Sequence, residues 1–333
     1  MTYGEVYHYG SEKLEKAGVP DAALDARILL EHVCGTSRND LFVHGEALVT
    51  EENRLNYEAL INQRSQRIPL QQLTGAQYFM GLEFRVNEHV LIPRQETEIL
   101  VEEALKNLHD GMRVLDLCTG SGCILISLLR YSNGCQGLGT DISREALAVA
   151  EENACKLLGI ESLPEGEVIP DGNDFPGEDC PSDGNDSPGW DCLSTGNSFP
   201  DRGAVPKEGD RIASLRFIES DLFEKVEGKF DMIVSNPPYI PSSVVETLMP
   251  EVRDHEPKLA LDGSEDGLMF YRRITQECGR YLTRGGMLFF EIGFDQGAAV
   301  STLMEKAGFL EIQVIKDYAG MDRVVFGTLG FDM

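Results

Sequence analysis

Short apolar segments alternate with longer amphipathic ones along the last two thirds of the chain. The apolar segments, which predict buried strands, are Arg113–Leu117, Gln136–Thr140, Leu215–Ile218, Phe230–Ser235, Met287–Ile292, Glu311–Ile315 and Asp322–Gly327. Apolar residues at helical spacing predict helices over Glu96–Leu108, Cys123–Tyr131 and Ser143–Leu158, and near 267–282 and 296–307. This alternation predicts βαβ units, and therefore an α/β fold with a mostly parallel sheet covered on both faces. The last two strands are too close in sequence for a crossover helix, so we expect one antiparallel edge.

The first 72 residues have a different pattern, with helical periodicity and little β-branched alternation. Helices are predicted over Ala22–Val33, with Asp21 as a candidate N-cap, and over Glu51–Arg67, with Thr50 as a candidate N-cap. Glycines and an Asn-Glu pair then interrupt short apolar segments, which is typical of a β-hairpin. We therefore expect a helical domain at 1–72, a hairpin linker at 73–93 and the α/β domain at 94–333.

Residues 161–210 interrupt the α/β pattern. They contain 7 of the 15 prolines, 8 glycines and 13 acidic against 2 basic residues, and a repeat unit beginning Asp-Gly-Asn-Asp starts at Asp171 and again at Asp183. The unit has almost nothing apolar to bury, and it lacks the ligand alternation and closing Glu of a calcium loop. We therefore expect a solvated, disordered insertion without a metal site.

Composition and net charge exclude some classes of function. The 333 residues are 42% hydrophobic, which is ample for a large core, and they carry 29 basic against 56 acidic side chains, a net charge of −27. That acidity argues against general binding to a nucleic-acid backbone, which needs clustered Lys and Arg. The 8 cysteines form no C-x-x-C pair and no zinc-ligand spacing. The start of the chain has no signal-sequence pattern and no apolar run is long enough for a membrane span, so we expect a soluble, cytoplasmic protein.

A glycine turn follows the strand Arg113–Leu117. In the segment Cys118-Thr119-Gly120-Ser121-Gly122, a ligand could approach the backbone closely and meet free N–H groups of the next helix. Asp141, at the end of the next strand, could accept both hydroxyls of a ribose, as in adenosine-containing cofactors. The segment lacks the G-x-G-x-x-G spacing of dinucleotide sites, so a purely structural turn stays open at this point.

The sequence Asn236-Pro237-Pro238-Tyr239 follows the strand Phe230–Ser235. Two prolines cannot continue a strand or a helix, but at the carboxyl end of a strand they form a stiff turn whose carbonyls face no competing donors. The Asn236 side-chain oxygen and the Pro237 carbonyl could together bind one NH2 group, with Tyr239 as a flat wall. Ligands of open α/β sheets bind at this end of the strands, although a plain Pro-Pro turn is the structural alternative.

Together the two motifs predict a sulfonium methyl donor near Asp141 and a planar NH2 acceptor at Asn236. The nitrogen of an amide or aromatic amine is a poor nucleophile because its lone pair is delocalised. Binding both N–H groups to acceptors orients the lone pair at the methyl carbon and stabilises the charge that develops on nitrogen. Catalysis by Asn236, Pro237 and Tyr239 would then need no metal and no covalent nucleophile.

These motifs and several others give the chain a family resemblance. The shared segments are Pro69–Gly75, Leu91–Glu98, Cys118–Gly122, Asn236–Tyr239, Glu256-Pro257, Ala260–Gly263, Asp266–Leu268 and Glu291–Gly293, spread over nearly the whole chain outside 161–210. The chain resembles peptide chain release factor glutamine methyltransferases, which methylate the glutamine of the Gly-Gly-Gln motif in bacterial-type release factors and support translation termination.

The resemblance implies a Rossmann-like class I methyltransferase sheet, with S-adenosylmethionine as cofactor and S-adenosylhomocysteine as product. The implied cofactor-binding residues are Cys118, Thr119, Gly120, Ser121, Gly122, Asp141, Leu222 and Asn236. The implied glutamine-binding residues are Asn236, Pro237, Pro238 and Tyr239, and the helical domain is implied to help dock the release factor. Cys118 stands where the family usually has Gly, and Leu222 stands where it often has an aromatic residue nearby.

Two alternatives stay open. Enzymes that methylate the exocyclic amine of adenine share the Asn-Pro-Pro-Tyr turn, but they need a basic groove and a means of flipping the base, which the acidic composition disfavours. A non-catalytic module that binds an adenosyl ligand would have no need for the acceptor pair at Asn236 and Pro237.

Overall fold

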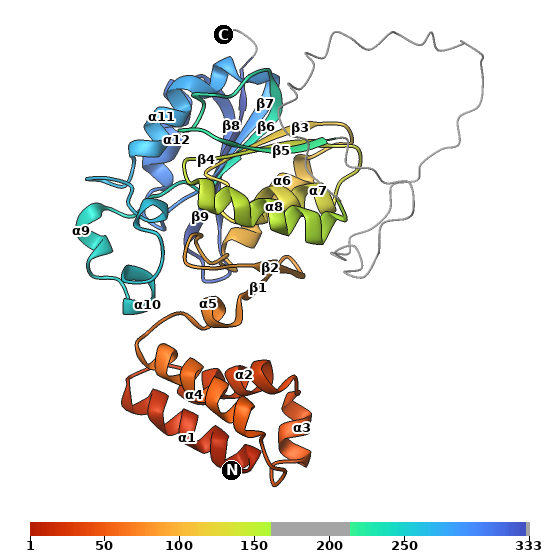
Figure 1. Ribbon diagram of the computed structural model, residues 1–333. Helices are drawn as coiled ribbons and strands as arrows, with labels where there is room; N and C mark the ends of the chain where they lie inside the picture. The colour runs from red at the N-terminus through yellow and green to blue at the C-terminus, as the bar shows by residue number, and fades with distance from the viewer. Residues whose placement is uncertain (161–213, 331–333) are drawn as a thin grey trace, which may run out of the picture.

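The computed structural model describes residues 1–160 and 214–330, and the acidic insertion predicted at 161–210 lies outside them. A small helical lobe at the N-terminal end is joined by a short two-stranded segment to a larger lobe built on a sheet (Figure 1). Within the described ranges, no helix is long and apolar enough to cross a membrane.

The helical lobe consists of α1 (Tyr3–Lys16), α2 (Ala22–Cys34), α3 (Arg38–Val43), α4 (Glu51–Ser65) and α5 (Leu70–Thr74). Apolar faces of α1, α2 and α4 form its core, in which Leu14, Leu29, Leu30, Tyr57 and Ile61 are fully buried. The Thr50 side chain caps α4, as predicted, by accepting a hydrogen bond from Asn53 N. Asp21 precedes α2 but makes no side-chain capping bond.

The predicted hairpin is formed by β1 (Ala76–Phe79) and β2 (Leu82–Arg85), which pair in antiparallel fashion. Phe79 and Phe84 are buried and meet edge to face, with ring centroids 6.0 Å apart. Both rings join the core of the larger lobe, so the hairpin packs against the sheet rather than standing free.

Seven strands form the central sheet. They are β3 (Arg113–Leu117), β4 (Gln136–Asp141), β5 (Ser214–Glu219), β6 (Phe230–Ser235), β7 (Leu282–Glu291), β8 (Phe309–Lys316) and β9 (Asp322–Leu329), in the spatial order β5-β4-β3-β6-β7-β9-β8. The first five in that order are parallel, while β9 runs antiparallel to both β7 and β8. The predicted mostly parallel sheet with an antiparallel edge is therefore confirmed. β7 begins at Leu282 rather than at Met287, because Leu282 pairs with Phe230 ahead of an irregularity in the register.

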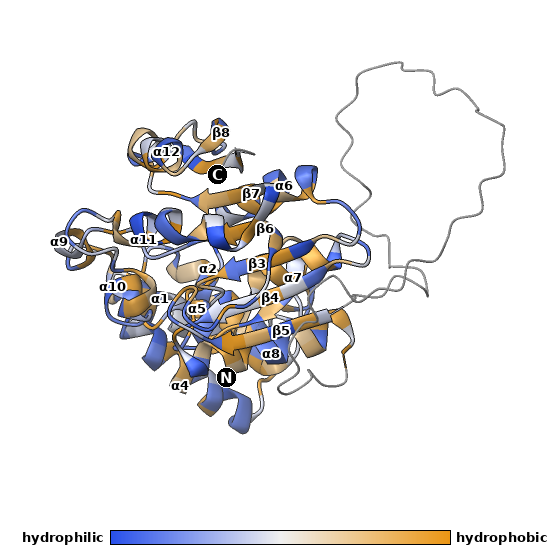
Figure 2. Ribbon diagram, turned by 90° about the horizontal axis from the view of Figure 1, so that it is seen from above, coloured by the Kyte–Doolittle hydropathy of each residue, from blue (hydrophilic) through white to orange (hydrophobic). Residues whose placement is uncertain are grey.

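Helices cover both faces of the sheet. One face carries α6 (Thr97–Asn107), α7 (Cys123–Arg130) and α8 (Arg144–Leu158), and the other carries α11 (Met269–Glu277), the 3-10 turn η2 (Cys278–Arg280) and α12 (Gly297–Lys306). Side chains of β3 alternate between the two faces of the sheet. Val114 packs against α6, α7 and α8, and the next residue, Leu115, packs against α11 and α12. Figure 2 shows apolar residues along β5 and β7 inside these layers.

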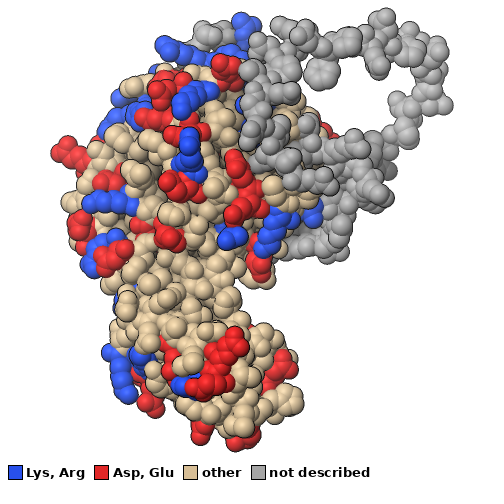
Figure 3. Space-filling view, viewed as in Figure 1, with Lys and Arg blue, Asp and Glu red and all other residues tan. Residues whose placement is uncertain are grey.

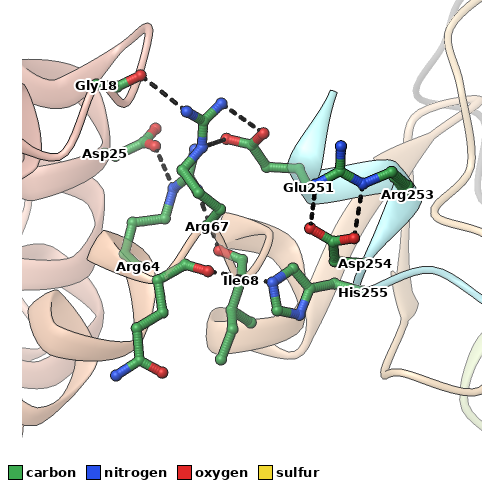
Figure 4. A network of polar contacts seen from close by, with 10 residues as sticks. Gly18, Asp25, Arg64, Arg67, Ile68, Glu251, Arg253, Asp254 and His255 are labelled. Carbon is green, nitrogen blue, oxygen red and sulfur yellow. Dashed lines mark hydrogen bonds and ion pairs between the residues drawn. The ribbon is translucent and has the colours of Figure 1, made fainter. Parts of the chain in front are cut away.

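The segment after β6 reaches back to the helical lobe. It contains α9 (Ser242–Val245), α10 (Pro250–Arg253) and the 3-10 turn η1 (Lys258–Ala260), and α10 lies on the side that faces the helical lobe (Figure 1). Arg64 donates to Glu251 Oε1 at 3.0 Å, and Arg67 donates to both carboxylate oxygens of Glu251 at 2.6 Å (Figure 4). Arg64 also pairs with Asp25 at 2.7 Å. A network of buried and partly buried charges therefore joins the lobes in addition to the chain itself.

Candidate active site

Four residues at the carboxyl ends of neighbouring strands form a row at one edge of the sheet. Leu117 of β3 is paired in register with Thr140 of β4 and with Ser235 of β6, and Ser235 is paired with Phe290 of β7. The next residues along the chain are therefore neighbours, in the order Asp141, Cys118, Asn236, Glu291. This row brings the glycine loop, Asp141 and the Asn-Pro-Pro-Tyr turn together at the point where the strand order reverses.

The glycine loop reaches α7 through left-handed backbone conformations, with φ of 61° at Cys118, 56° at Gly120 and 77° at Gly122. A Cβ at Gly122 would lie 2.8 Å from Ile126 Cδ1, so glycine is needed there for close packing. A Cβ at Gly120 would meet no atom within 4 Å. The Gly120 backbone therefore faces open space, where a ligand could approach it.

Cys118 takes the backbone conformation that a glycine would adopt at lower cost. Its side chain packs against the apolar cluster on the α11–α12 face of the sheet, and burial raises the pKa of its thiol. The cysteine therefore leaves the left-handed turn in place and adds a neutral side chain beneath it.

The Asp141 carboxylate is tied to the glycine loop. Oδ2 accepts a hydrogen bond from Gly120 N and Oδ1 accepts one from Ser143 N, each at 2.9 Å. Burial raises the pKa of Asp141, and these two backbone donors oppose the rise. Because a carboxylate has about four acceptor positions, both oxygens keep the capacity to accept a further hydroxyl group.

The side chains of Thr119 and Ser121 point into the protein. Thr119 is 3% exposed and its hydroxyl donates to Asp116 Oδ2 at 2.6 Å, while Ser121 is 2% exposed. Burial raises the pKa of Asp116 to about 7, and the hydrogen bond from Thr119 offsets only part of the rise. The side chains of Thr119 and Ser121 are therefore not available to a ligand.

Leu222 and Phe223 follow β5, next to β4. Ser220 N donates to Asp141 O at 2.9 Å, which ties this turn to the row. Phe223 is buried and stacks on Tyr281, with ring centroids 4.5 Å apart, so the core uses its ring. Leu222 has a left-handed backbone with φ of 52° and is also buried, so any contact it makes with a ligand is apolar.

The Asn-Pro-Pro-Tyr turn starts directly beside the glycine loop. Ser235 Oγ donates to Leu117 O at 2.7 Å, and Asn236 Nδ2 donates to Thr97 Oγ1 at 3.4 Å. Pro237 and Pro238 are buried. Among residues 1–160 and 214–330, no donor binds Asn236 Oδ1 or the Pro237 carbonyl. Two adjacent residues therefore each keep an acceptor available.

Gln296, at the start of α12, braces the far end of the turn. Its Nε2 donates to Tyr239 O at 3.0 Å and to Gly267 O at 3.3 Å, and its Oε1 accepts from Gly293 N at 2.9 Å. Gly267 has φ of 72°, and a Cβ there would collide with Tyr239 O. The loop that contains Gly267 and the Asn-Pro-Pro-Tyr turn are therefore packed backbone against backbone.

Tyr239 is held as a fixed, neutral ring. Its hydroxyl donates to Glu291 Oε1 at 3.3 Å, and burial raises the pKa of Tyr239. Glu291, the last residue of β7, is 2% exposed. Burial also raises the pKa of Glu291, against the influence of the nearby Thr97, Arg323 and Tyr239.

The sequence patterns assign no role to Thr97, Glu291 or Gln296, which all contact the turn. Glu291 could have been predicted from the sequence as a site residue, because it comes directly after the apolar residues of β7, as Asn236 comes after those of β6. Thr97 has the weaker signal of lying in a segment shared with the family. Gln296 has no local signal, since its partner Tyr239 lies 57 residues earlier in the chain.

The chain is similar in sequence to release factor glutamine methyltransferases. Residues 5–75 match the family described as the PrmC N-terminal domain. The chain is 35% identical to the release factor glutamine methyltransferase of Agrobacterium fabrum over 94% of this chain and 93% of the relative. It is 36% identical to the protein of the same name from Clostridium acetobutylicum, over 92% of this chain and 91% of the relative.

A solved structure of related description is also similar. It is the release factor-specific protein-(glutamine-N5) methyltransferase of Alicyclobacillus acidocaldarius, with 25% identity and a TM-score of 0.35. The match covers 74% of this chain and 99% of that chain.

Proposed function

The chain belongs to the release factor glutamine methyltransferases, and from this premise we propose that it methylates the side-chain amide nitrogen of the glutamine in the Gly-Gly-Gln motif of release factors. The proposed methyl donor is S-adenosylmethionine, and S-adenosylhomocysteine is the second product. The observation that carries the proposal is the pair of adjacent acceptors at Asn236 and Pro237, directly beside the glycine loop, to which no donor binds in the described part of the chain.

The residues of the glycine loop fit S-adenosylmethionine. Gly120 presents its backbone to open space, and the Asp141 carboxylate keeps the acceptor capacity that a ribose diol needs. The remaining proposed contacts are the backbone of Cys118, Thr119, Ser121 and Gly122, an apolar contact from Leu222, and Asn236. When bound, the cofactor supplies a methyl group on a positively charged sulfur.

The Asn-Pro-Pro-Tyr turn prepares the glutamine nitrogen for methylation. Asn236 Oδ1 and the Pro237 carbonyl accept its two N–H groups, so the nitrogen lone pair is directed away from both acceptors and toward the methyl group. The same two oxygens stabilise the positive charge that develops on nitrogen. Tyr239 limits the rotation of the amide plane, and Pro238 keeps the turn stiff.

The domain roles are part of the same proposal. We assign release factor docking to the helical domain at 1–72, and methyl transfer to the domain at 94–333, with the hairpin segment at 73–93 between them. Support comes from α10, which belongs to the segment that follows Asn236 and is held by Arg64 and Arg67 of the helical lobe. Because its proposed substrate acts in translation termination, the protein is expected to work in the cytoplasm.

Methylation of adenine in nucleic acid is the weaker candidate. That reaction would use the same acceptor pair, but it needs a basic surface that follows the phosphate backbone. On the face in Figure 3, Lys and Arg lie among Asp and Glu and form no continuous basic stripe. The net charge of −27 also disfavours binding to a nucleic-acid backbone.

Transfer of labelled methyl groups tests the proposal. The protein is incubated with labelled S-adenosylmethionine and either a release factor or adenine-containing DNA, and we expect label on the release factor. Asn236→Ala should lower kcat by about 10²–10³-fold, the usual loss when one preorganised polar group is removed from the reacting centre. The exposed Asn133→Ala serves as the control and should be unchanged. Label on DNA alone, or undiminished transfer by Asn236→Ala, would contradict the proposal.

A further inference from the structure

Asn153, in the second half of α8, is completely buried, and its side-chain amide binds the backbone of two segments that are distant in sequence. Its Oδ1 accepts a hydrogen bond from Arg85 N at 2.7 Å. Its Nδ2 donates to Arg85 O and to Ser121 O, each at 3.0 Å. Because two of these partners are carbonyl groups and the third is an N–H group, only one orientation of the amide can bind all three.

The first of these segments is the hairpin between the lobes, in which Arg85 is the last residue of β2. The helix α8 lies beside this hairpin (Figure 1). One turn further along α8, Lys156 Nζ donates to Glu83 O at 3.1 Å and to Glu83 Oε1 at 2.8 Å. The hairpin is therefore attached to α8 at two points, of which only Asn153 also reaches the glycine loop.

The second segment is the glycine loop itself. Ser121 lies between Gly120 and Gly122, whose left-handed backbones have φ of 56° and 77°. The loop is tied to β4 by the hydrogen bond from Gly120 N to Asp141, and to α8 by the hydrogen bond from Asn153 to Ser121 O. The second tie comes from the protein interior, because Asn153 is 0% exposed. It therefore leaves free the open space that the Gly120 backbone faces.

We propose that Asn153 is a positioning residue for the cofactor, which holds the glycine loop, through Ser121 O, in the conformation that binds S-adenosylmethionine. The inference rests on the proposed function, because it concerns the cofactor proposed there. Glycines give a loop many accessible conformations, and a ligand that must order such a loop binds less tightly. The hydrogen bond from Asn153 orders the loop before the cofactor binds, and Asn153 itself needs no contact with the cofactor.

The test compares the affinity of Asn153→Ala and of the wild type for S-adenosylmethionine by calorimetry. Loss of the amide leaves Ser121 O without this donor, and we expect the Kd to rise by about tenfold or more, the usual effect of one lost hydrogen bond. Lys156→Met is the first control, since it removes the other attachment of the hairpin to α8 but leaves Asn153 in place. Its Kd should equal that of the wild type.

A second control separates positioning from a general loss of stability. Met304 is fully buried in α12, on the opposite face of the sheet from α8, so Met304→Ala creates a core cavity far from the loop. This variant should unfold at a lower temperature but keep the wild-type Kd. In the protein without cofactor, the backbone amides of residues 120–123 should exchange hydrogen faster in Asn153→Ala than in Met304→Ala.

Equal Kd values for Asn153→Ala and Met304→Ala overturn the inference. If Asn153→Ala does not fold, Asn153→Asp decides in its place. That variant keeps the volume and the acceptor for Arg85 N, but it has at most one proton for two carbonyl groups, so its Kd should rise severalfold. An unchanged Kd in Asn153→Asp then overturns the inference.

Failure of the proposed function gives a different result. A wild-type protein that does not bind S-adenosylmethionine overturns the proposed cofactor, and this inference with it. A wild-type protein that binds the cofactor but does not methylate a release factor overturns the proposed substrate alone. In that case the ratio of the Kd values of Asn153→Ala and wild type still decides the role of Asn153.

Discussion

The guanidinium of Arg64 and the carboxylate of Glu251 lie 3.0 Å apart although 187 positions separate them in sequence. Arg64 belongs to α4 of the helical lobe, and Glu251 belongs to α10, in the segment that follows the Asn-Pro-Pro-Tyr turn. Both side chains are buried, and Asp25 and Arg67 complete the network (Figure 4). The position of the helical lobe is thereby tied to the segment that carries the proposed catalytic turn.

Glu251→Gln should loosen this connection. The substitution keeps the side-chain volume but leaves two arginines with a neutral partner, and breaking a buried ion pair costs about 3–5 kcal/mol in the free energy of unfolding. We expect a lower Tm and a higher KM for an intact release factor, with an unchanged KM for a short Gly-Gly-Gln peptide that does not reach the helical lobe. The control is Asp254→Asn, whose partner Arg253 is exposed and whose loss should cost less than about 1 kcal/mol. If both variants lost the same stability and raised KM for the release factor equally, a special role for Glu251 would be contradicted.

Acid should weaken the same contact. Burial opposes ionisation of Glu251, but the hydrogen bonds from Arg67 and Arg64 outweigh it and hold the pKa of Glu251 below its ordinary value. A carboxylate with a lowered pKa stabilises the folded state above its ordinary pKa and loses that contribution as the pH falls through the lowered value. The stability difference between wild type and Glu251→Gln should therefore shrink as the pH falls below about 4.5. Unfolding curves at several acidic pH values measure it, and a constant difference would be evidence against the assignment.

Asp141→Asn should weaken cofactor binding more than catalysis. An amide oxygen can accept from Gly120 N or Ser143 N, but the NH2 that replaces the second oxygen cannot, so one loop contact and one acceptor for the cofactor are lost. We expect the Kd for S-adenosylmethionine to rise by about 10–100-fold, as for other hydrogen bonds to a charged group. At saturating cofactor kcat should change little. Calorimetry measures the affinity, and Asp110→Asn, exposed near the opposite end of β3, is the control.

Gly267→Ala should displace the catalytic turn. The new Cβ would collide with Tyr239 O. The backbone of Gly267 is also left-handed, with φ of 72°, which costs a residue with a Cβ about 1–2 kcal/mol of stability. Gly111→Ala is a matched control, because Gly111 has φ of 80° and open space around its Cα. Both variants should lose stability, but only Gly267→Ala should lose kcat, by about tenfold or more, since small displacements of reacting groups are costly. Steady-state kinetics and thermal unfolding separate the two effects, and equal kcat values would refute the bracing role.

Asp116→Asn should change how stability depends on pH. Burial raises the pKa of Asp116 to about 7, so between its ordinary pKa and 7 the folded state holds a proton that the unfolded state has released. The wild type therefore loses stability as the pH rises from about 4 to about 7, and this loss levels off above that range. The variant has no ionisable group at this position and so does not lose this stability, and its stability relative to wild type should rise over the same interval. Denaturant unfolding across that range measures the difference, and a flat difference would contradict the raised pKa.

The sequence alone determined the order of the seven sheet strands and of the helices that cover them, together with the two motifs of the proposed site. It did not predict α1, α3, α5, or the short helices α9 and α10 that follow β6. Short apolar segments predicted the strands from Arg113 onward, because the central strands of a sheet covered on both faces must be largely apolar. The Asn236–Tyr239 turn and the glycine loop were readable because each acts through its own local backbone. The parallel sheet then required both motifs to lie at the same edge.

Tertiary structure decided which side chains support that site. Thr97, Glu291 and Gln296 contact the turn from α6, β7 and the start of α12, and Glu251 meets Arg64 across the two lobes. None of these contacts follows from local periodicity, because each depends on how segments far apart in sequence pack together. A hydrogen bond needs its donor and acceptor within a few tenths of an ångström of the proper distance, and only the packed fold sets positions that closely.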